Sequence, residues 1–573
     1  MKTSRFARLV LHLGLMVLRV HGQGTLTTLV TFNGVNGAYP CGALLQGMDG
    51  NLYGTTCDLG SNLVVLTSGT NVISGPEFGS GTLFEVITNG TNGVILTNLL
   101  LLNNASSVAS GQDLAYVYAG VTQRGYNGNL YGIVEGLSFI HNSAFIFDIQ
   151  SDEISNFGSS FFTNALWLTG GLIEGGDGAF YGTAAAGGPW LNDFGDSPGF
   201  AFKMSFNGEF TLLYAFTGED DGGFPTGGLV QGGDGSFYGT TLLGGWWNAG
   251  TVFRLTTNGI LTTLYSFSGS DDGYCPFAGL VQGNDGILYG TTAYGGVYDE
   301  IADGYGGGTV FKITTNGTLT TLASFSGDDG ALPVAPLVKG PDGNFYGTTY
   351  TGGLNFTNGA SFDDGGRGMY GAGGSSPEYS ASTLAAILSQ NTGLPAPPVP
   401  NGSGTIYTVT PAGALSTVYS FSPIAGVLTN EYQYLLSSLG YPPVTTNTLK
   451  VWGPTNSDGA NPSAGLTLAS DGTFYGVTQS GGVYGEGTVF HFEPTILSVR
   501  PQFQTVSLNG NVFSFSWNAN VGTTYEVQYS TNLTGTNWEN CGEPFLATNS
   551  SASASDYVGY TNSQRFYRLI ASP

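Results

Sequence analysis

The sequence predicts an all-β protein: a seven-bladed β-propeller of four-stranded blades, closed by the N-terminal strand and followed by a small β-sandwich. Three observations support this fold class. A phrase ending in Tyr-Gly recurs at about the spacing of one propeller blade. Abundant Gly and aromatic residues with sparse charge favour strands joined by tight turns. The start of the chain copies a strand that the last repeat lacks.

The recurring phrase consists of a glycine-containing turn, an aliphatic or aromatic residue, and Tyr-Gly. Successive copies lie 78, 50, 57, 51, 57 and 129 residues apart. Their tyrosines are Tyr53, Tyr131, Tyr181, Tyr238, Tyr289, Tyr346 and Tyr475. A period of about 50 residues is the size of one four-stranded blade. The long last gap is explained by two expected insertions, at about 354–402 and 423–454, of which the first is rich in Gly, Ser and Pro.

The repeat at 227–267 indicates how the strands of one blade follow one another. Tight Asp-Gly and Asn-Gly turns lie at 233–235 and 258–259, and a longer loop lies at 242–249. The expected strands are 227–231, 236–241, 250–255 and 260–267. Because the first strand is short and rich in Gly in every good repeat, we expect it at the crowded inner position near a central channel.

The two ends of the repeat region indicate that the array closes on itself. Residues 25–32, Thr-Leu-Thr-Thr-Leu-Val-Thr-Phe, copy the fourth strand at 261–267, and the last repeat stops after its third strand at 490–492. The N-terminal strand is therefore expected to complete the last blade, which would hide both sheet edges. An open array or a different number of blades remains the alternative.

Three motifs carry a resemblance to a known family. They are the phrase Asp285 to Thr292, the Gly-Thr-Val-Phe strand at 308–311, and the Thr-Thr-Asn-Gly turn at 314–317. Together they resemble the GloVer-type tandem repeats of secreted bacterial proteins, over residues 23–494. The resemblance implies a secreted or surface-attached repeat protein with no established reaction.

Residues 495–573 abandon the repeat. Short alternating runs at 513–517 and 525–530, followed by Trp538 and 566–569, predict several strands of a small β-sandwich. The arrangement resembles fibronectin type III-like modules. We therefore expect a separate C-terminal module after the propeller.

The first 22 residues are expected to be an export signal. Lys2, Arg5 and Arg8 precede a mostly apolar run that is too short to span a bilayer, and no later stretch is apolar enough to do so. Without this segment, which holds four of the 14 basic residues, 10 basic side chains face 39 acidic ones, a net charge of −29. Such a surface repels nucleic acid and anionic membranes. We expect a secreted or cell-surface monomer.

Cys41 and Cys57 flank the turn at 48–50 symmetrically, which centres a hairpin on position 49. The two side chains are expected to face each other across paired strands, and export allows them to form a disulfide. Two free thiols are the alternative. Cys275 and Cys541 have no evident partner in the sequence.

Five blade-to-blade loops carry Asp or Asn, then Gly, two residues and Pro. Four of these loops place an aspartate first: Asp221, Asp272, Asp329 and Asp458. One interpretation is structural, since Asp caps a turn and Gly supplies a positive φ. The other is a ring of carboxylates that binds calcium, because hard cations prefer oxygen ligands.

The loops between second and third strands hold unusual aromatic residues, on the face where function normally lies. The candidates for ligand binding are Trp190, Trp246, Trp247, Tyr298 and Tyr305. Exposed aromatic rings often mark a binding site, and sugar rings stack on such rings, so a glycan is the expected ligand. The alternative is that these rings cover the hydrophobic ends of the blades.

Catalysis has little support in the sequence. After the export signal only His141 and His491 remain, and no nucleophile, metal-ligand or phosphate-binding motif is present. The expected function is therefore non-catalytic binding or scaffolding, with an extracellular polysaccharide or another surface protein as partner. The alternative is a polysaccharide lyase or glycosidase that uses carboxylates of the loops.

Overall fold

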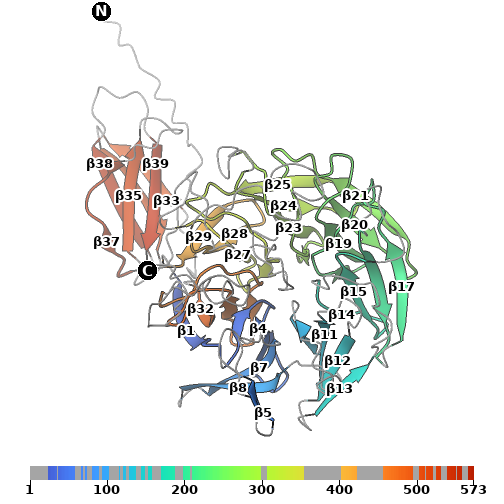
Figure 1. Cartoon of the computed structure of the whole chain (residues 1–573). Helices are drawn as coiled ribbons and strands as arrows, with labels where there is room; N and C mark the ends of the chain where they lie inside the picture. Colours follow the sequence, from blue (N-terminus) through green and yellow to red (C-terminus); the bar gives the residue numbers. More distant parts are fainter. Residues whose placement is uncertain are drawn as a thin grey trace, which may run out of the picture. The chain divides into compact units, whose positions relative to one another are not determined.

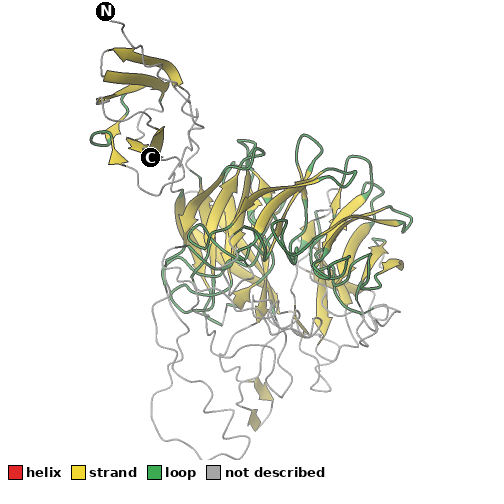
Figure 2. Cartoon of the chain, turned by 90° about the horizontal axis from the view of Figure 1, so that it is seen from above, coloured by secondary structure: helices red, strands yellow, loops and turns green. Residues whose placement is uncertain are grey.

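The computed structural model contains strands and loops, and no helix occurs among the residues that it describes (Figures 1 and 2). The described residues are 24–34, 36–58, 66–68, 71–73, 81–89, 93–101, 115–116, 120–123, 128–136, 143–148, 153–157, 170–187, 198–206, 209–297, 306–353, 402–422, 456–494, 503–509, 512–519, 524–530, 539–549, 551–557 and 566–572. The chain divides into two compact units, one formed mainly by the repeats and one that contains Glu493–Pro573. The expected export signal and most of both expected insertions lie outside the described residues.

Six sheets of the repeat unit, here called blades 1 to 6, are each built from strands that follow one another in the sequence. Blade 1 contains β2 (Ala38–Pro40), β3 (Leu45–Gln46), β4 (Leu52–Asp58), β7 (Thr82–Asn89) and β8 (Gly93–Leu101), with the separate hairpin β5 (Leu66–Ser68) and β6 (Asn71–Ile73) inserted between β4 and β7. Blade 2 contains β9 (Ala115–Tyr116), β10 (Thr122–Gln123), β11 (Leu130–Gly136), β12 (Ser143–Asp148) and β13 (Glu153–Phe157).

The next four blades are simple four-stranded antiparallel meanders. Blade 3 is β14 (Ile173–Glu174), β15 (Phe180–Ala184), β16 (Phe200–Met204) and β17 (Phe210–Ala215); blade 4 is β18 (Val230–Gln231), β19 (Phe237–Thr241), β20 (Thr251–Leu255) and β21 (Leu261–Ser266). Blade 5 is β22 (Val281–Gln282), β23 (Leu288–Thr292), β24 (Thr309–Ile313) and β25 (Leu319–Ser324); blade 6 is β26 (Val338–Lys339), β27 (Phe345–Thr349), β28 (Thr405–Val409) and β29 (Leu415–Ser420). The expected propeller arrangement of four-stranded sheets is confirmed.

A further sheet, the closing sheet, combines the two ends of the repeat region. Its order is β1 (Thr25–Thr31), β32 (Thr488–Glu493), β31 (Phe474–Thr478) and β30 (Thr467–Leu468). The expected pairing of residues 25–32 with the third strand of the last repeat is therefore confirmed. In Figure 1 the closing sheet lies beside blade 1.

The tyrosine of the repeated phrase closes the turn that precedes it. In blade 4 the Tyr238 hydroxyl donates to Asp234 over 3.0 Å, and Asp234 also accepts the backbone N–H of Ser236 over 3.1 Å. The same tyrosine-to-aspartate bond joins Tyr53 to Asp49, Tyr181 to Asp177, Tyr289 to Asp285, Tyr346 to Asp342 and Tyr475 to Asp471, over 2.6–3.1 Å. Phenylalanine could not make this bond, which explains why tyrosine recurs.

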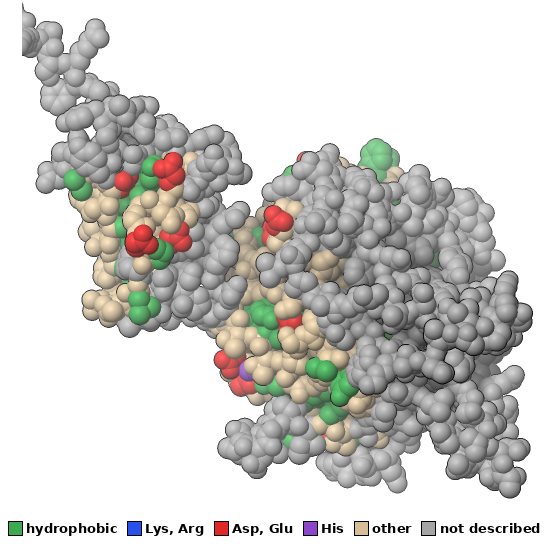
Figure 3. Space-filling model, turned by 60° about the vertical axis from the view of Figure 1, so that its left-hand side comes forward, with side chains coloured by type: hydrophobic (Ala, Val, Ile, Leu, Met, Phe, Trp, Pro, Cys, Tyr) green, Lys and Arg blue, Asp and Glu red, His purple; other side chains and the backbone are tan. Residues whose placement is uncertain are grey.

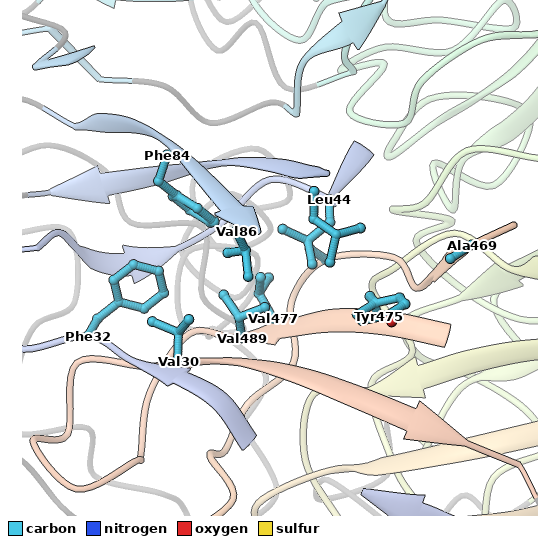
Figure 4. Packing of buried hydrophobic residues seen from close by; sticks show 11 residues of the cluster. Val30, Phe32, Leu44, Phe84, Val86, Ala469, Tyr475, Val477 and Val489 are labelled. Carbon is cyan, nitrogen blue, oxygen red and sulfur yellow. The ribbon is translucent and has the colours of Figure 1, made fainter. Parts of the chain in front are cut away.

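Neighbouring sheets are joined by a repeated aromatic contact. A phenylalanine follows the last strand of blades 3 to 6 and β1 of the closing sheet, and it packs edge-on against the third-strand ring of the next sheet. The pairs are Phe216–Phe253, Phe267–Phe311, Phe325–Tyr407, Phe421–Phe490 and Phe32–Phe84, with centroids 4.9–5.5 Å apart. The last pair joins the closing sheet to blade 1 and repeats the geometry of the others. Figure 4 shows the surrounding core, in which Val30 and Phe32 lie beside Phe84 and Val86.

Blade 6 departs from its sister blades at Tyr407, which stands where the others have phenylalanine. Tyr407 is fully buried, and its hydroxyl has no hydrogen-bond partner among the described residues. A buried polar group without a partner costs roughly 1–3 kcal/mol. Tyr407→Phe is therefore expected to raise the free energy of unfolding by about 1 kcal/mol, measured by denaturant titration. The matched change Phe311→Tyr is expected to lower it, and a gain in stability from both variants would contradict this explanation.

The first strands surround a central cavity of about 280 Å³, as the sequence predicts. Small residues from blades 1 to 5 and the closing sheet line it, among them Gly42, Gly120, Gly170, Gly227, Gly279 and Gly465. Threonines of the second strands join adjacent blades here, since Thr240 donates to the Ala278 carbonyl over 2.8 Å. The expected strand 227–231 is reduced to Val230–Gln231, because residues 227–228 turn to line the cavity.

Cys41 and Cys57 form a disulfide with Cα atoms 6.0 Å apart. The hairpin next to the turn has the expected register, with Leu45 opposite Tyr53. Farther out the register changes, and Pro40 lies opposite Thr56. The two cysteines therefore meet diagonally across the strands rather than directly opposite each other.

The C-terminal unit contains two antiparallel sheets with one shared core. One consists of β33 (Phe503–Asn509), β34 (Val512–Asn518) and β38 (Ser551–Tyr557); the other consists of β35 (Thr524–Ser530), β36 (Glu539–Asn540), β37 (Phe545–Leu546) and β39 (Phe566–Ser572). The rings of Trp517 in the first sheet and Tyr525 in the second pack within this core, with their centroids 5.7 Å apart. The likeness to a fibronectin type III-like sandwich stays a prediction. Within the described part of the chain, no helix is long and apolar enough to cross a membrane.

Candidate functional site

The loops of each blade leave the sheet at two opposite ends. The loop from the second to the third strand and the loop to the next blade leave at one end, here called the loop face. The short turns leave at the other end, here called the turn face. The loop from the second to the third strand of blade 4 touches the loop that arrives from blade 3, since Gly223 and Leu243 exchange backbone hydrogen bonds of 2.9 and 3.1 Å.

Trp246 and Trp247 project from a well-fixed turn on the loop face of blade 4. Their side chains are 78% and 67% exposed. Gly244 and Gly245 precede them with φ near +77° and +78°, values that suit glycine, and Asn248 follows at +52°. Gly244 N–H donates to the Asn248 side-chain oxygen over 2.8 Å, and Gly245 N–H donates to the Glu219 carbonyl over 2.6 Å. The turn therefore holds two indoles in solvent at a fixed place; here this turn with its indoles is called the tryptophan tip.

The same Gly-Gly turn recurs in blades 5 and 6 and in the closing sheet. The second glycine donates its N–H to the neighbouring blade-to-blade loop each time: Gly296 to the Ser270 carbonyl, Gly353 to the Gly327 carbonyl and Gly482 to the Asn456 side chain, over 2.9–3.0 Å. The residue after the turn is exposed at Val297 (60%) and Val483 (59%). The loop face thus repeats one scaffold and varies the apolar residues it presents. Tandem Gly-Gly before exposed apolar residues is the sequence signal for this scaffold.

The four predicted calcium ligands make bonds within their own blades. Asp221 accepts the Tyr214 hydroxyl and the Thr217 N–H, each over 2.9 Å, and Asp272 accepts the equivalent groups of Tyr265 and Ser268. Asp458 accepts the Tyr419 hydroxyl over 2.7 Å, and Asp329 accepts the Ser326 N–H over 2.7 Å. Burial, then the bond to aspartate, raises the pKa of Tyr214 and Tyr265 to about 12. These carboxylates act as turn caps, the structural alternative that the sequence left open.

No three acidic, histidine or cysteine side chains of the described residues lie close enough together to hold a metal ion. Each predicted calcium ligand lies in a different blade-to-blade loop and accepts hydrogen bonds from its own loop or from the strand before it. The described part of the loop face therefore gives no support to the calcium interpretation.

The residue before proline in five blade-to-blade loops has an unusual backbone conformation, which the sequence analysis missed. Tyr39, Phe224, Cys275, Leu332 and Asn461 all have φ between 52° and 58°. Bulky residues rarely adopt this region, so a compensating interaction is needed. The Cys275 N–H donates to the Ala249 carbonyl of blade 4 over 3.0 Å. The Cys275 carbonyl accepts the N–H of Ala293 in blade 5 over 2.9 Å. The residue thus joins two adjacent blades.

Cys275 is also explained by this joint. Its side chain is fully buried in a cluster with Phe224 and Leu332, the equivalent residues of the neighbouring blades. Burial raises the pKa of the Cys275 thiol well above its usual value, so the thiol stays protonated. Cys275 is therefore a packing residue of the joint.

The structure places two of the five predicted ligand-binding residues. Trp246 and Trp247 lie exposed on the loop face, whereas Trp190, Tyr298 and Tyr305 lie outside the described residues. The sequence left open whether such rings cover the ends of the blades. For Trp246 and Trp247 the high exposure argues against that alternative, because a covering ring would itself be largely buried.

Residues 168–363 match the family model of the Gloeobacter/Verrucomicrobia repeat. This segment spans blades 3 to 5 and the beginning of blade 6, so the repeat resemblance is supported there. No curated protein matches the chain.

Solved structures with distant similarity include enzymes. A fungal alcohol oxidase of the AA5 family, in complex with copper, is 13% identical, with a TM-score of 0.42 over 95% of this chain and 92% of that one. An oligogalacturonate lyase from Vibrio parahaemolyticus is 9% identical, with a TM-score of 0.42 over 84% and 96%. Likeness at this level carries no information about the function of this chain.

Proposed function

We propose that this chain is a non-catalytic binding protein that recognises a glycan through its loop face, with Trp246 and Trp247 as the main contacts. The observation that carries the proposal is the tryptophan tip. Two large apolar side chains exposed side by side lose favourable burial, and a fixed turn keeps them there. Pyranose rings present flat C–H faces that pack on indoles, so a sugar chain fits this display.

The carboxylates of the loop face support binding over catalysis. A glycosidase places two carboxyl groups on either side of one bond. Here Asp221, Asp272, Asp329 and Asp458 lie in four separate loops and accept hydrogen bonds from their own loop or from the strand before it. The alternative of a polysaccharide lyase or glycosidase has no comparable observation in its favour.

The proposal includes the architecture that presents the site. We infer that the closing sheet acts as the seventh blade of a closed ring over residues 23–494, and that residues 495–573 form a fibronectin type III-like sandwich. Residues 1–22 direct export, and the mature protein works as a monomer outside the cytoplasm. The aromatic contact between Phe32 and Phe84 supports the closed ring, since it repeats the contact between the other sheets.

A glycan array with the purified full chain tests the function. Trp246→Ala/Trp247→Ala is expected to weaken binding of the recognised glycan about 100-fold, because each stacked indole contributes roughly 1–1.5 kcal/mol. The matched control is Val483→Ala/Tyr484→Ala, at the equivalent turn of the closing sheet, which is expected to bind normally.

Two results would reject the proposal. One is an array on which no glycan binds above background. The other is a glycan whose affinity is unchanged in the tryptophan variant while the melting temperature shows an intact fold, because the ligand would then bind elsewhere.

A further inference from the structure

The described cationic side chains of the repeat unit all lie at the turn face. Lys203 and Arg254 pair with Asp177 and Asp234 of the short turns, over 2.7 and 2.9 Å. Lys312 donates to the Pro411 carbonyl in a turn of blade 6, and Lys339 donates to the side chain of Asn284 in a turn of blade 5. Figure 3 shows acidic side chains scattered over one side of the molecule, with no lysine or arginine in view there. The described part of the loop face therefore carries negative charge without cations to balance it.

The tryptophan tip has two exposed carboxylates beside it. Glu219 and Asp220 are exposed in the blade-to-blade loop. The Glu219 carbonyl accepts the N–H of Gly245, one residue before Trp246, and the Asp220 carbonyl accepts the Thr263 hydroxyl over 3.2 Å. The backbone of both acids is thus fixed next to the indoles, while their carboxylates face solvent.

Among the four described Gly-Gly turns, the turn of blade 4 alone combines two tryptophans with two acids. The positions of Glu219 and Asp220 are occupied by Ser270 and Asp271 in blade 5, by Gly327 and Asp328 in blade 6, and by Asn456 and Ser457 in the closing sheet. The scaffold is the same in all four, so the specialisation lies in the side chains of blade 4.

We propose that the tryptophan tip of blade 4 binds a cationic glycan, a polymer of amino sugars with free ammonium groups, in preference to neutral or anionic ones. This inference rests on the proposed function and specifies its ligand class. The pyranose rings stack on Trp246 and Trp247, and the ammonium groups pair with Glu219 and Asp220. Indole faces also attract cations. A polyanion is repelled by the acids that no cation balances in the described part of the loop face.

The test measures affinities by isothermal titration calorimetry at low salt, with a glucosamine hexamer and its fully N-acetylated counterpart as probes. The full chain is expected to prefer the glucosamine hexamer at least tenfold. Glu219→Gln/Asp220→Asn is expected to remove about tenfold of this affinity and to leave the affinity for the acetylated hexamer within twofold. Asp271→Asn, at the equivalent loop of blade 5, serves as the matched control with no expected effect. Salt at 0.5 M is expected to weaken binding of the glucosamine hexamer alone.

Each outcome bears on a different step. Equal or tighter binding of the acetylated hexamer, or an unchanged glucosamine affinity in the amide variant, overturns the cationic ligand and leaves glycan binding intact. Binding of neither hexamer, with no other glycan bound on the array, overturns both proposals. Tighter binding of an oligolysine peptide of equal charge, abolished by Trp246→Ala/Trp247→Ala, would show that the tip docks a basic protein segment instead.

Discussion

Deletion of residues 23–33 is expected to destabilise the repeat unit by at least about 5 kcal/mol. The deletion removes β1, which forms the outer strand of the closing sheet, and leaves β32 with an unpaired edge. It also removes Val30 and Phe32, which are 8% and 0% exposed, from the core between the closing sheet and blade 1 (Figure 4). The measurement is the denaturant midpoint of the full chain with and without these residues.

Point variants separate the contribution of packing from that of the strand. Phe32→Ala is expected to cost about 3–5 kcal/mol, since it removes the ring that packs against Phe84. Thr27→Ala, at an exposed position of the same strand, is expected to change stability by less than about 0.5 kcal/mol. A peptide of residues 23–33 is expected to restore part of the lost stability when added to the deleted protein. An unchanged midpoint after the deletion would show that the N-terminal strand does not hold the array together.

Gly279→Ala is expected to destabilise the protein by about 3 kcal/mol, because the methyl group has no space near the central cavity. A Cβ at this position would lie 2.6 Å from the carbonyl oxygen of Gly228 and 3.1 Å from its nitrogen. These are backbone atoms of the adjacent blade, so they can move only if the two blades separate. The free energy of unfolding by denaturant titration measures the effect.

Gly233 provides the matched control for Gly279. It lies in a turn of blade 4 where a Cβ would meet nothing within 4 Å, and its φ is not positive. Gly233→Ala is expected to be neutral or to stabilise the protein by a few tenths of a kcal/mol, as the unfolded chain loses freedom. Equal effects of the two substitutions would mean that close contact between blades is not what requires glycine at position 279.

The sequence was sufficient to predict the order of the strands in a regular blade, because each repeat carries its own local signals. Asp-Gly turns, alternating apolar residues and the copied strand at 25–32 led to the observed sheets and to the pairing of β1 with β32. The sequence displays the recurrence of Tyr238 and its equivalents but not the reason for it. That reason depends on a bond to an aspartate four residues earlier, which only the folded turn displays.

Other features depend on contacts between blades and could not be read from single repeats. The positive φ of Cys275 and its equivalents arises because one residue must bond to two sheets at once, while proline is normally preceded by extended backbone. The repeated Asp-Gly loops were compatible with both calcium binding and turn capping. The partners Tyr214 and Tyr265 that favour capping come from the preceding strand, and the sequence alone does not place them beside the aspartates.

Tryptophan indole signals in a two-dimensional NMR titration test most directly whether the tryptophan tip is the binding site. The chain has seven tryptophans. On addition of a glucosamine hexamer, the indole N–H signals of Trp246 and Trp247 are expected to shift together, while that of the buried Trp517 stays in place. Single replacements by phenylalanine assign the signals. Shifts confined to other tryptophans, or no shift at saturating concentrations of any glycan on the array, would contradict the account.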